Sequence, residues 1–520
     1  MPNQDSNPDS ILTNKPNNRL RNIGIVMLLT FLSKVFGFVR DLTLAYYYGA
    51  SNVSDAYLIS LTIPEFVFSL VIQAIAVGFI PIFVEIIHSD GEREAESFTN
   101  QVLTILYICG VVVLLFLNVF PRGIVSVFAS GFDADTMSLA ASFVRITAIA
   151  LLFKGTVSVL SAYCQANGEF ARPAAVGMPL DLIIILSIII SAHFDPRILA
   201  YGTVVGFASQ VFIVFPFCKK RGYQFRLSLQ LNNPHIKKMI ALFLPVVIGV
   251  GANQINILVD RTLASRIAIG GISALNYANK IDNIMENVIV MSIAGVMYPI
   301  FATLATKKDY DSLKANLLTT FDEVMLLMIP ITVGAIIFSE PIISLLFTRG
   351  AFDMHASTMT ARAMAGYSIG MLGVSFRAIL TRVFYSLQDI KTPVINSAIA
   401  VGINIVLNLV LSRYLGISGL AIASSIASIV CSFLMLLQLK KRIGLALKTV
   451  LSHGGMMLVA ASIMVAVCLL SYHALVNHLH FSAALIISIL IGLVFYGAEA
   501  LIIKMPGTTG ILSMIKKKHD

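Results

Sequence analysis

The stretch Ser33–Asp55, SKVFGFVRDLTLAYYYGASNVSD, places Lys34, Arg40 and Asp41 inside an apolar run that begins at Ile23. A charge at the centre of a membrane helix costs roughly 2.5–3.5 kcal/mol on insertion scales, so such residues usually face a water-filled cavity. Two interpretations fit. Arg40 and Asp41 either cap a helix end and reach the membrane surface, or line a polar pocket for an anionic substrate.

The composition identifies the class of protein. Of 520 residues, 57% are hydrophobic and 12% are charged, whereas soluble proteins carry about 25% charged residues. Apolar runs of about 20 residues recur along the chain, which is typical of transmembrane helices. We expect an all-α polytopic membrane protein with about fourteen spans: 22–47, 53–86, 100–120, 138–165, 173–193, 198–218, 236–265, 271–304, 314–338, 357–387, 393–412, 416–439, 452–473 and 481–503.

The basic residues predict the orientation of these spans. With both termini in the cytoplasm, 23 of the 37 Lys and Arg residues fall on the cytoplasmic side, 5 on the opposite side and 9 within spans. This asymmetry follows the positive-inside rule. It also accounts for the formal charge of +10 without a nucleic-acid partner, and none is expected.

The chain contains an internal repeat. DLTLA at Asp41 resembles DRTLA at Asp260, GFD at Gly131 resembles AFD at Ala351, and Pro173 corresponds to Pro393, with separations of 219, 220 and 220 residues. An even number of spans per copy gives two lobes of parallel topology. We expect a disordered tail (1–20), an N-lobe of spans 1–6 (21–230), a C-lobe of spans 7–12 (231–445), and spans 13–14 with a basic tail (446–520).

Two lobes around a central cavity are typical of a transporter that works by alternating access. The positions of Lys34, Arg40, Arg261 and Lys280 predict a positive cavity to which both lobes contribute. Arg binds phosphate through a planar fork and Lys as a point charge, so the cavity favours an anionic substrate. Asp41 belongs to the same site, and we expect Asp55 to pair with one of the cations or to hold a gate shut.

A second group of polar residues suits a cation. Asp260, Asn404, Asn408 and Ser424 all carry side-chain oxygens, and Asn404 and Asn408 share a helix face because they are four residues apart. They predict a Na⁺ site. The alternative is that Asp260 pairs with Arg261 while the asparagines hydrogen-bond helices together.

The chain lacks common enzyme motifs. No GxxxxGK[ST], HExxH or usable GxSxG segment is present, and the five cysteines show no metal or redox spacing. We expect no catalytic residues and no cofactor other than Na⁺ as a coupling ion. The energy would come from an ion gradient or the membrane potential.

Five segments resemble the signatures of the MurJ (MviN) lipid II flippases, which belong to a superfamily of multidrug, oligosaccharidyl-lipid and polysaccharide exporters. They are SKVFGFVRD, GASNVSDAY, QINILVDRTLAS, LFTRGAFD and YSLQDIKTPV. The resemblance covers spans 1–12 and implies a secondary-type transporter that moves the undecaprenyl-pyrophosphate-linked peptidoglycan precursor across a bacterial cytoplasmic membrane. Implied partners are this lipid-linked anionic glycan, membrane lipids and the cell-wall synthesis machinery; we expect a monomer.

The family pattern is matched only in part. Lys34 replaces an arginine, and the YADR segment reads Tyr277-Ala278-Asn279-Lys280. Near Phe68 the arginine of the family is missing, and Glu65 stands where an asparagine is usual. A flippase for another polyprenyl-linked glycan, such as a teichoic acid, O-antigen or exopolysaccharide unit, is therefore an alternative. A cation-coupled drug antiporter fits the positive cavity less well.

Overall fold

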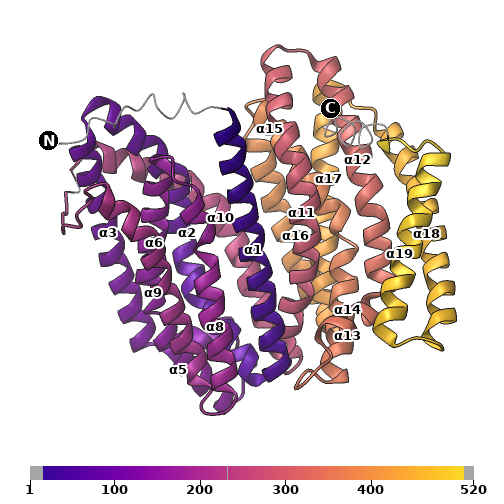
Figure 1. Cartoon of the computed structure of the whole chain (residues 1–520), viewed down its shortest axis with the longest axis horizontal. Helices are drawn as coiled ribbons and strands as arrows, with labels where there is room; N and C mark the ends of the chain where they lie inside the picture. The colour runs from indigo at the N-terminus through magenta and orange to yellow at the C-terminus, as the bar shows by residue number, and fades with distance from the viewer. Residues whose placement is uncertain (1–15, 231, 509–520) are drawn as a thin grey trace. The chain divides into compact units, whose positions relative to one another are not determined.

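The computed structural model describes residues 16–230 and 232–508, and the regular secondary structure in these ranges is helical (Figure 1). The all-α prediction is confirmed. The predicted tail (1–20) lies outside the described residues up to position 15, but residues from Pro16 on are already helical. Proline suits a first helical turn because its fixed φ is helical and its missing N–H would be unsatisfied there.

The described residues form two compact units that divide between Arg266 and Ile267. Unit 1 contains α1 (Pro16–Tyr48), α2 (Asn52–Ser89), α3 (Glu92–Val119), α4 (Pro121–Phe128), α5 (Ala134–Thr147), α6 (Ala150–Ala166), α7 (Ala171–Ala175), α8 (Gly177–Ser191), α9 (Arg197–Lys220) and nearly all of α10 (Pro234–Ile267). Unit 2 contains α11 (Gly271–Thr306), α12 (Tyr310–Ile337), α13 (Ser339–Phe347), α14 (Met354–Ser368), α15 (Met371–Ser386), α16 (Lys391–Leu415), α17 (Ile417–Ile443), α18 (Leu447–Val476) and α19 (Phe481–Ile502).

The boundary between the units differs from the one expected at residue 230. The last turns of α10 are hydrogen-bonded to the end of α4 and to the loop that follows it, within unit 1. Thr262 Oγ1 donates to the Val127 carbonyl (2.8 Å), and Arg266 Nε donates to Ser130 Oγ (2.7 Å). These bonds explain why the seventh predicted span belongs with the first six.

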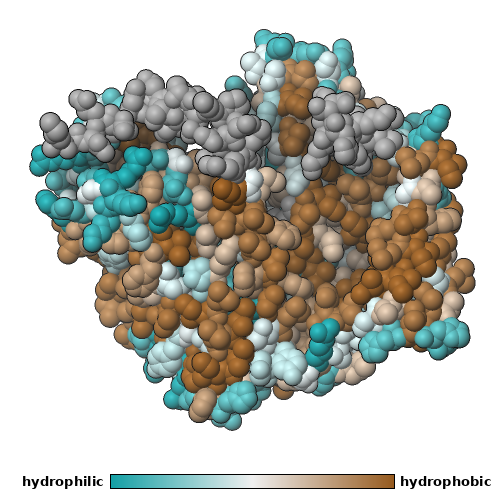
Figure 2. Space-filling model, viewed as in Figure 1, coloured by the Kyte–Doolittle hydropathy of each residue, from teal (hydrophilic) through white to brown (hydrophobic). Residues whose placement is uncertain are grey.

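The helices suit a membrane. Nine helices in the described ranges are long and apolar enough to cross one, and eleven spans result if each of two bent pairs counts as one. The long helices α1, α2 and α10 carry predicted spans 1, 2 and 7, and the total of fourteen stays a prediction. Hydrophobic residues cover the middle of the helices on the visible face, and hydrophilic residues gather near the helix ends (Figure 2).

The internal repeat is visible in the helices. Asp133 caps α5 by accepting from the Thr136 amide, and Asp353 caps α14 by accepting from the Ala356 amide, both at 2.8 Å. The pair α5–α6 bends by 41°, and the pair α14–α15 bends by 43°. Because the caps and the breaks recur about 220 residues apart, the two units share one plan.

The loops that follow these bent pairs also correspond. Gly168 and Gln388 both have a positive φ, +80° and +59°, a conformation that a non-glycine residue adopts only at some cost. In unit 2, Arg442 Nη1 lies 2.6 Å from Asp389 Oδ2. Burial raises the pKa of Asp389, but hydrogen bonds from Thr392 and the charge of Arg442 together bring it below its usual value.

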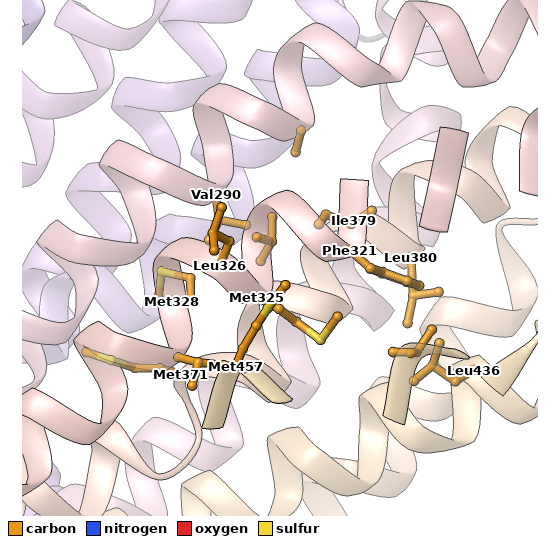
Figure 3. Packing of buried hydrophobic residues seen from close by; sticks show 14 of the residues in the cluster. Val290, Phe321, Met325, Leu326, Met328, Met371, Ile379, Leu380, Leu436 and Met457 are labelled. Atoms are coloured by element: carbon orange, nitrogen blue, oxygen red, sulfur yellow. The ribbon is translucent and has the colours of Figure 1, made fainter. Parts of the chain in front are cut away.

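The core of unit 2 is an apolar cluster around α12. Val290 of α11, Phe321 and Met325 of α12, Leu380 of α15 and Met457 of α18 are buried there (Figure 3). The cluster continues into the pair α18–α19, which therefore packs against the repeat as a C-terminal addition.

Close packing of α15 on α17 gives a first prediction. A Cβ atom at Gly373 would lie 2.8 Å from the Ile429 amide nitrogen, whereas one at Gly402 on α16 would meet no atom within 4 Å. Overpacking costs about 1–3 kcal/mol. Gly373→Ala should lower the melting temperature in lipid nanodiscs, and Gly402→Ala should not. Equal melting temperatures for the two variants would contradict this packing.

Candidate functional site

The charged residues of the first span form a network in unit 1. Arg40 of α1 contacts two carboxylates: its Nη1 lies 2.8 Å from Asp181 Oδ1 of α8, and its Nη2 lies 2.8 Å from Asp41 Oδ1. Arg40 Nε also donates to Asp41 Oδ1, at 3.0 Å. The Arg40 side chain is 25% exposed, and both aspartate side chains are 7% exposed. Arg40 is thus held within unit 1 rather than capping a helix end.

Asp181 is a member of this network that the sequence analysis missed. It stands in the apolar segment PLDLIII, about 140 residues after Arg40, and α1 packs directly against α8. Gly37 permits this approach, because a Cβ atom there would lie only 3.4 Å from Asp181 Oδ2. A lone acid in an apolar run was the available signal, since a buried charge needs a partner.

Lys34 and Asp55 lie in different surroundings. Lys34 is exposed on α1, about one and two-thirds helical turns before Arg40. Asp55 is buried in the first turn of α2, where the helix dipole favours a negative charge. The Ser51–Ser54 capping box fixes that turn. The position of Asp55 is therefore fixed by the capped first turn of α2. Its role in a gate stays a prediction.

The remaining predicted substrate residues are distributed over both units. Arg261 lies half-buried near the end of α10 in unit 1, and Lys280 lies half-buried on α11 in unit 2. Each unit therefore contributes at least one of the predicted cations.

Three of the four predicted cation ligands cluster in unit 2. Asn404 Nδ2 donates to Ser424 Oγ (3.1 Å), and Asn408 Nδ2 donates to Asn404 Oδ1 (2.7 Å). Asn404 and Asn408 are 2% and 0% exposed. The first bond links α16 to α17, as the helix-packing alternative expects, and the second lies within α16. Together they concentrate side-chain oxygens at one point. The fourth residue, Asp260, lies half-buried on α10 in unit 1.

The segment that departs from the family pattern has its own polar contacts. Glu65 Oε1 of α2 lies 3.1 Å from Lys154 Nζ of α6, and Gln254 Nε2 of α10 donates to Ser69 Oγ. Glu65 is 62% exposed. This α2 segment thus presents an exposed ion pair, in which Lys154 supplies a cation from a neighbouring helix.

A second buried acid was also missed by the sequence analysis. Asp282 of α11 is 8% exposed and accepts a hydrogen bond from Ser368 Oγ of α14 (3.2 Å). Glu286 lies one turn further along α11 and interacts electrostatically with both Asp282 and Arg377 of α15. Counting acids as well as bases within the spans would have found this group.

Within the described residues, no group of three or more His, Cys, Asp or Glu side chains could hold a metal ion. This finding does not apply to the Asn404–Ser424 cluster, whose oxygens come from carboxamides and a hydroxyl.

The chain is similar to one well-defined family. A family model described as lipid II flippase MurJ matches residues 44–495. The probable lipid II flippase MurJ of Buchnera aphidicola is 27% identical over 424 residues, covering 80% of this chain and 83% of that protein. The lipid II flippase MurJ of Burkholderia cenocepacia is 27% identical over 438 residues, covering 82% and 84%.

Solved structures share the fold. A lipid II flippase MurJ in an inward closed conformation aligns with a TM-score of 0.79 and 23% identity, over 92% of this chain and 98% of that chain. An inward-facing MATE-family multidrug transporter of the MOP superfamily aligns with a TM-score of 0.68 and 14% identity, over 81% and 98%.

The Arg40 network predicts a compensating pair of substitutions. Arg40→Gln leaves Asp41 and Asp181 buried without their cation, and breaking such a group costs about 3–5 kcal/mol. Its melting temperature should fall well below that of the wild type. Adding Asp181→Asn removes one of the two repelling charges and should restore part of the loss.

A double-mutant cycle on melting temperature and expression checks this coupling. Lys34→Gln is the matched control, since Lys34 is an exposed cation on the same helix. Additive effects of the Arg40 and Asp181 substitutions would contradict the network.

Proposed function

Because the chain belongs to the lipid II flippase MurJ family, we propose that it moves lipid II, the undecaprenyl-pyrophosphate-linked peptidoglycan precursor, from the inner to the outer leaflet of the bacterial cytoplasmic membrane. The observation that carries this proposal is the family match over residues 44–495. The Arg40 network fits it, since a diphosphate is an anion that a guanidinium binds well.

In the proposed mechanism, Arg40 receives the diphosphate. Asp41 and Asp181 hold the guanidinium in place before the substrate arrives, which reduces the cost of keeping a cation within the unit. The diphosphate then replaces part of this carboxylate contact, so binding is an exchange of anions around Arg40. Lys34, Arg261 and Lys280 add positive charge, while Asp55 holds the start of α2.

Energy for the cycle comes from an ion gradient or the membrane potential, which makes the protein a secondary-type transporter. Alternating access moves the head group while the lipid tail stays in the bilayer. The positive-inside count favours cytoplasmic termini. We further propose that the protein works as a monomer and has the cell-wall synthesis machinery as a partner.

Na⁺ is the proposed coupling ion. Hard cations such as Na⁺ prefer oxygen ligands, which Asn404, Asn408 and Ser424 supply at one buried point. Asp260 would add the negative charge. Where Na⁺ binds, it would replace the Asn404–Ser424 hydrogen bond as the link between α16 and α17.

The Na⁺ proposal predicts selective thermal stabilisation. A ligand that binds only the folded state raises stability in proportion to the logarithm of its concentration. NaCl should raise the melting temperature above that in equal KCl, and Asn404→Ala with Ser424→Ala should remove the difference. Asn396→Ala is the control, because Asn396 is a buried asparagine of α16 that hydrogen-bonds Gln438 instead. A Na⁺ effect that survives in the Asn404/Ser424 variant would exclude this site.

Depletion in the native host tests the transport function. Lipid II exposed on the outer leaflet should fall while the precursor accumulates inside, and wild-type protein should restore exposure. The double variant Arg40→Gln/Asp181→Asn should accumulate in the membrane without restoring it. If exposure of lipid II is unchanged on depletion, lipid II is not the substrate. The ion pair between Glu65 of α2 and Lys154 of α6 is then the first place to look for specificity for another glycan.

A further inference from the structure

The C-terminal unit contains a buried acid that the proposed substrate and Na⁺ sites do not use. We propose that Asp282 is a proton-binding site built against the break between α14 and α15, and that its protonation controls the packing of that break. Its link to transport rests on the proposed flippase function, whereas the protonation does not.

The geometry isolates one oxygen of this carboxyl group. Asp282 is 8% exposed, and Oδ1 accepts from the hydroxyl of Ser368, the last residue of α14. Oδ2 is buried and has no hydrogen-bond partner among the described residues. The helix axis turns by 43° directly after Ser368. The carboxyl group therefore touches the point at which the broken helix bends.

The charges on the surrounding helices do not neutralise an ionised Asp282. Glu286, one turn along α11, acts on it with the same sign of charge, and Lys280 projects about 200° around the helix from Asp282. The other acidic and basic residues on the central parts of the packed helices are Asp322 and Glu323 of α12, Arg362 of α14, and Arg377 and Arg382 of α15. The phenol of Tyr367 on α14 and the thiol of Cys431 on α17 are neutral groups and supply no cation.

Three of these residues interact with other groups. Asp322 hydrogen-bonds His453 of α18 (2.8 Å), and Arg377 acts on Glu286. Arg382 donates to the Ala378 carbonyl (3.0 Å). A buried carboxylate without a cation beside it favours its neutral acid form. The proton comes from water and binds Oδ2, which changes the charge of the group from −1 to zero.

Backbone carbonyls beside the break between α14 and α15 receive hydrogen bonds from a residue other than Asp282. Ser425 of α17 donates to the Gly366 and Tyr367 carbonyls, at 2.7 and 2.9 Å. At the corresponding break in unit 1, Thr147 Oγ1 donates to the Ser60 carbonyl of α2 (2.8 Å), a contact between neutral groups. Of these two contacts, the one in the C-terminal copy of the repeat includes a titratable group, Asp282. We infer that this acid does more than hydrogen-bond a residue at the bend.

The pH should change how α14 packs against α11. The neutral acid stays buried beside Ser368, so the packed break is favoured at low pH. Loss of the proton creates a buried carboxylate, which gains by moving toward water and away from Glu286. Rising pH should therefore loosen α14 from α11 at this level.

Infrared spectroscopy of the full-length protein in nanodiscs tests the protonation directly. The difference between wild type and Asp282→Asn at neutral pH should contain the carbonyl stretch of one protonated carboxyl group, which disappears only under alkaline conditions. A carboxylate signal at neutral pH in its place would overturn the proposal. Glu286→Gln is the matched control for a neighbouring acid on the same helix.

A second variant keeps the test independent of how well Asp282→Asn folds. Ser368→Ala retains the acid but removes its hydrogen-bond donor, so the carbonyl band should shift to higher frequency. An unshifted band would show that the acid does not contact the break.

Hydrogen exchange connects the proton to the helix. When the pH is raised, amides of residues 366–374 should exchange several-fold faster in the wild type than in Asp282→Asn at the same pH, since the asparagine cannot ionise. Equal exchange would exclude control of the break by Asp282. If the wild type flips lipid II in vesicles, Asp282→Asn should flatten the pH profile; absence of flipping by the wild type would count against the proposed function alone.

Discussion

The need to hydrogen-bond every backbone group within an apolar slab governs this structure. Unbroken α-helices meet that need internally, and for this reason the hydrophobic runs fold as long helices. Each unit then breaks one helix at the same place in the repeat, after Thr147 and after Ser368. Every such break frees carbonyl groups that a neighbouring helix must satisfy. Ser425 does so in unit 2, and this dependence fixes how α17 packs on the broken helix.

The same constraint applies to the charged side chains. Arg40 lies between two acids rather than alone, because a cation held within the unit needs compensation. Two carboxylates compensate the guanidinium without substrate, and in the proposed mechanism a diphosphate competes with them for Arg40. The proposal thus reconciles the stability of α1 with a role in binding anions, and it involves α8 because Asp181 pairs with Arg40.

Much of this was predictable from the sequence, because periodic signals need no knowledge of contacts. Hydropathy predicted the helices, and the spacing between the GFD and AFD segments predicted the copies, which the caps Asp133 and Asp353 confirm. Asp181 was not predicted, since its pairing with Arg40 depends on α1 packing against α8. The boundary was expected at residue 230 because the repeat begins again there. The compact units divide after Arg266, where hydrogen bonds that no sequence period encodes hold the end of α10 to unit 1. The lobe boundary at residue 230 stays a prediction.

The two copies of the repeat share the bent helix but differ in the side chains that contact the bend. The two breaks have similar angles, so the bend belongs to the common plan, but Thr147 meets a backbone carbonyl where Ser368 meets a carboxyl group. A neutral contact gives the bend at no electrostatic cost, so an acid in the second copy needs another reason to be kept. Unit 1 pairs Arg40 with two buried carboxylates, which suits the proposed anion capture. Unit 2 buries an acid and a carboxamide cluster, both of which suit small cations. In the proposal, the principal anion-binding residue, Arg40, and most of the Na⁺ ligands then belong to different units that inherited the same bent helix.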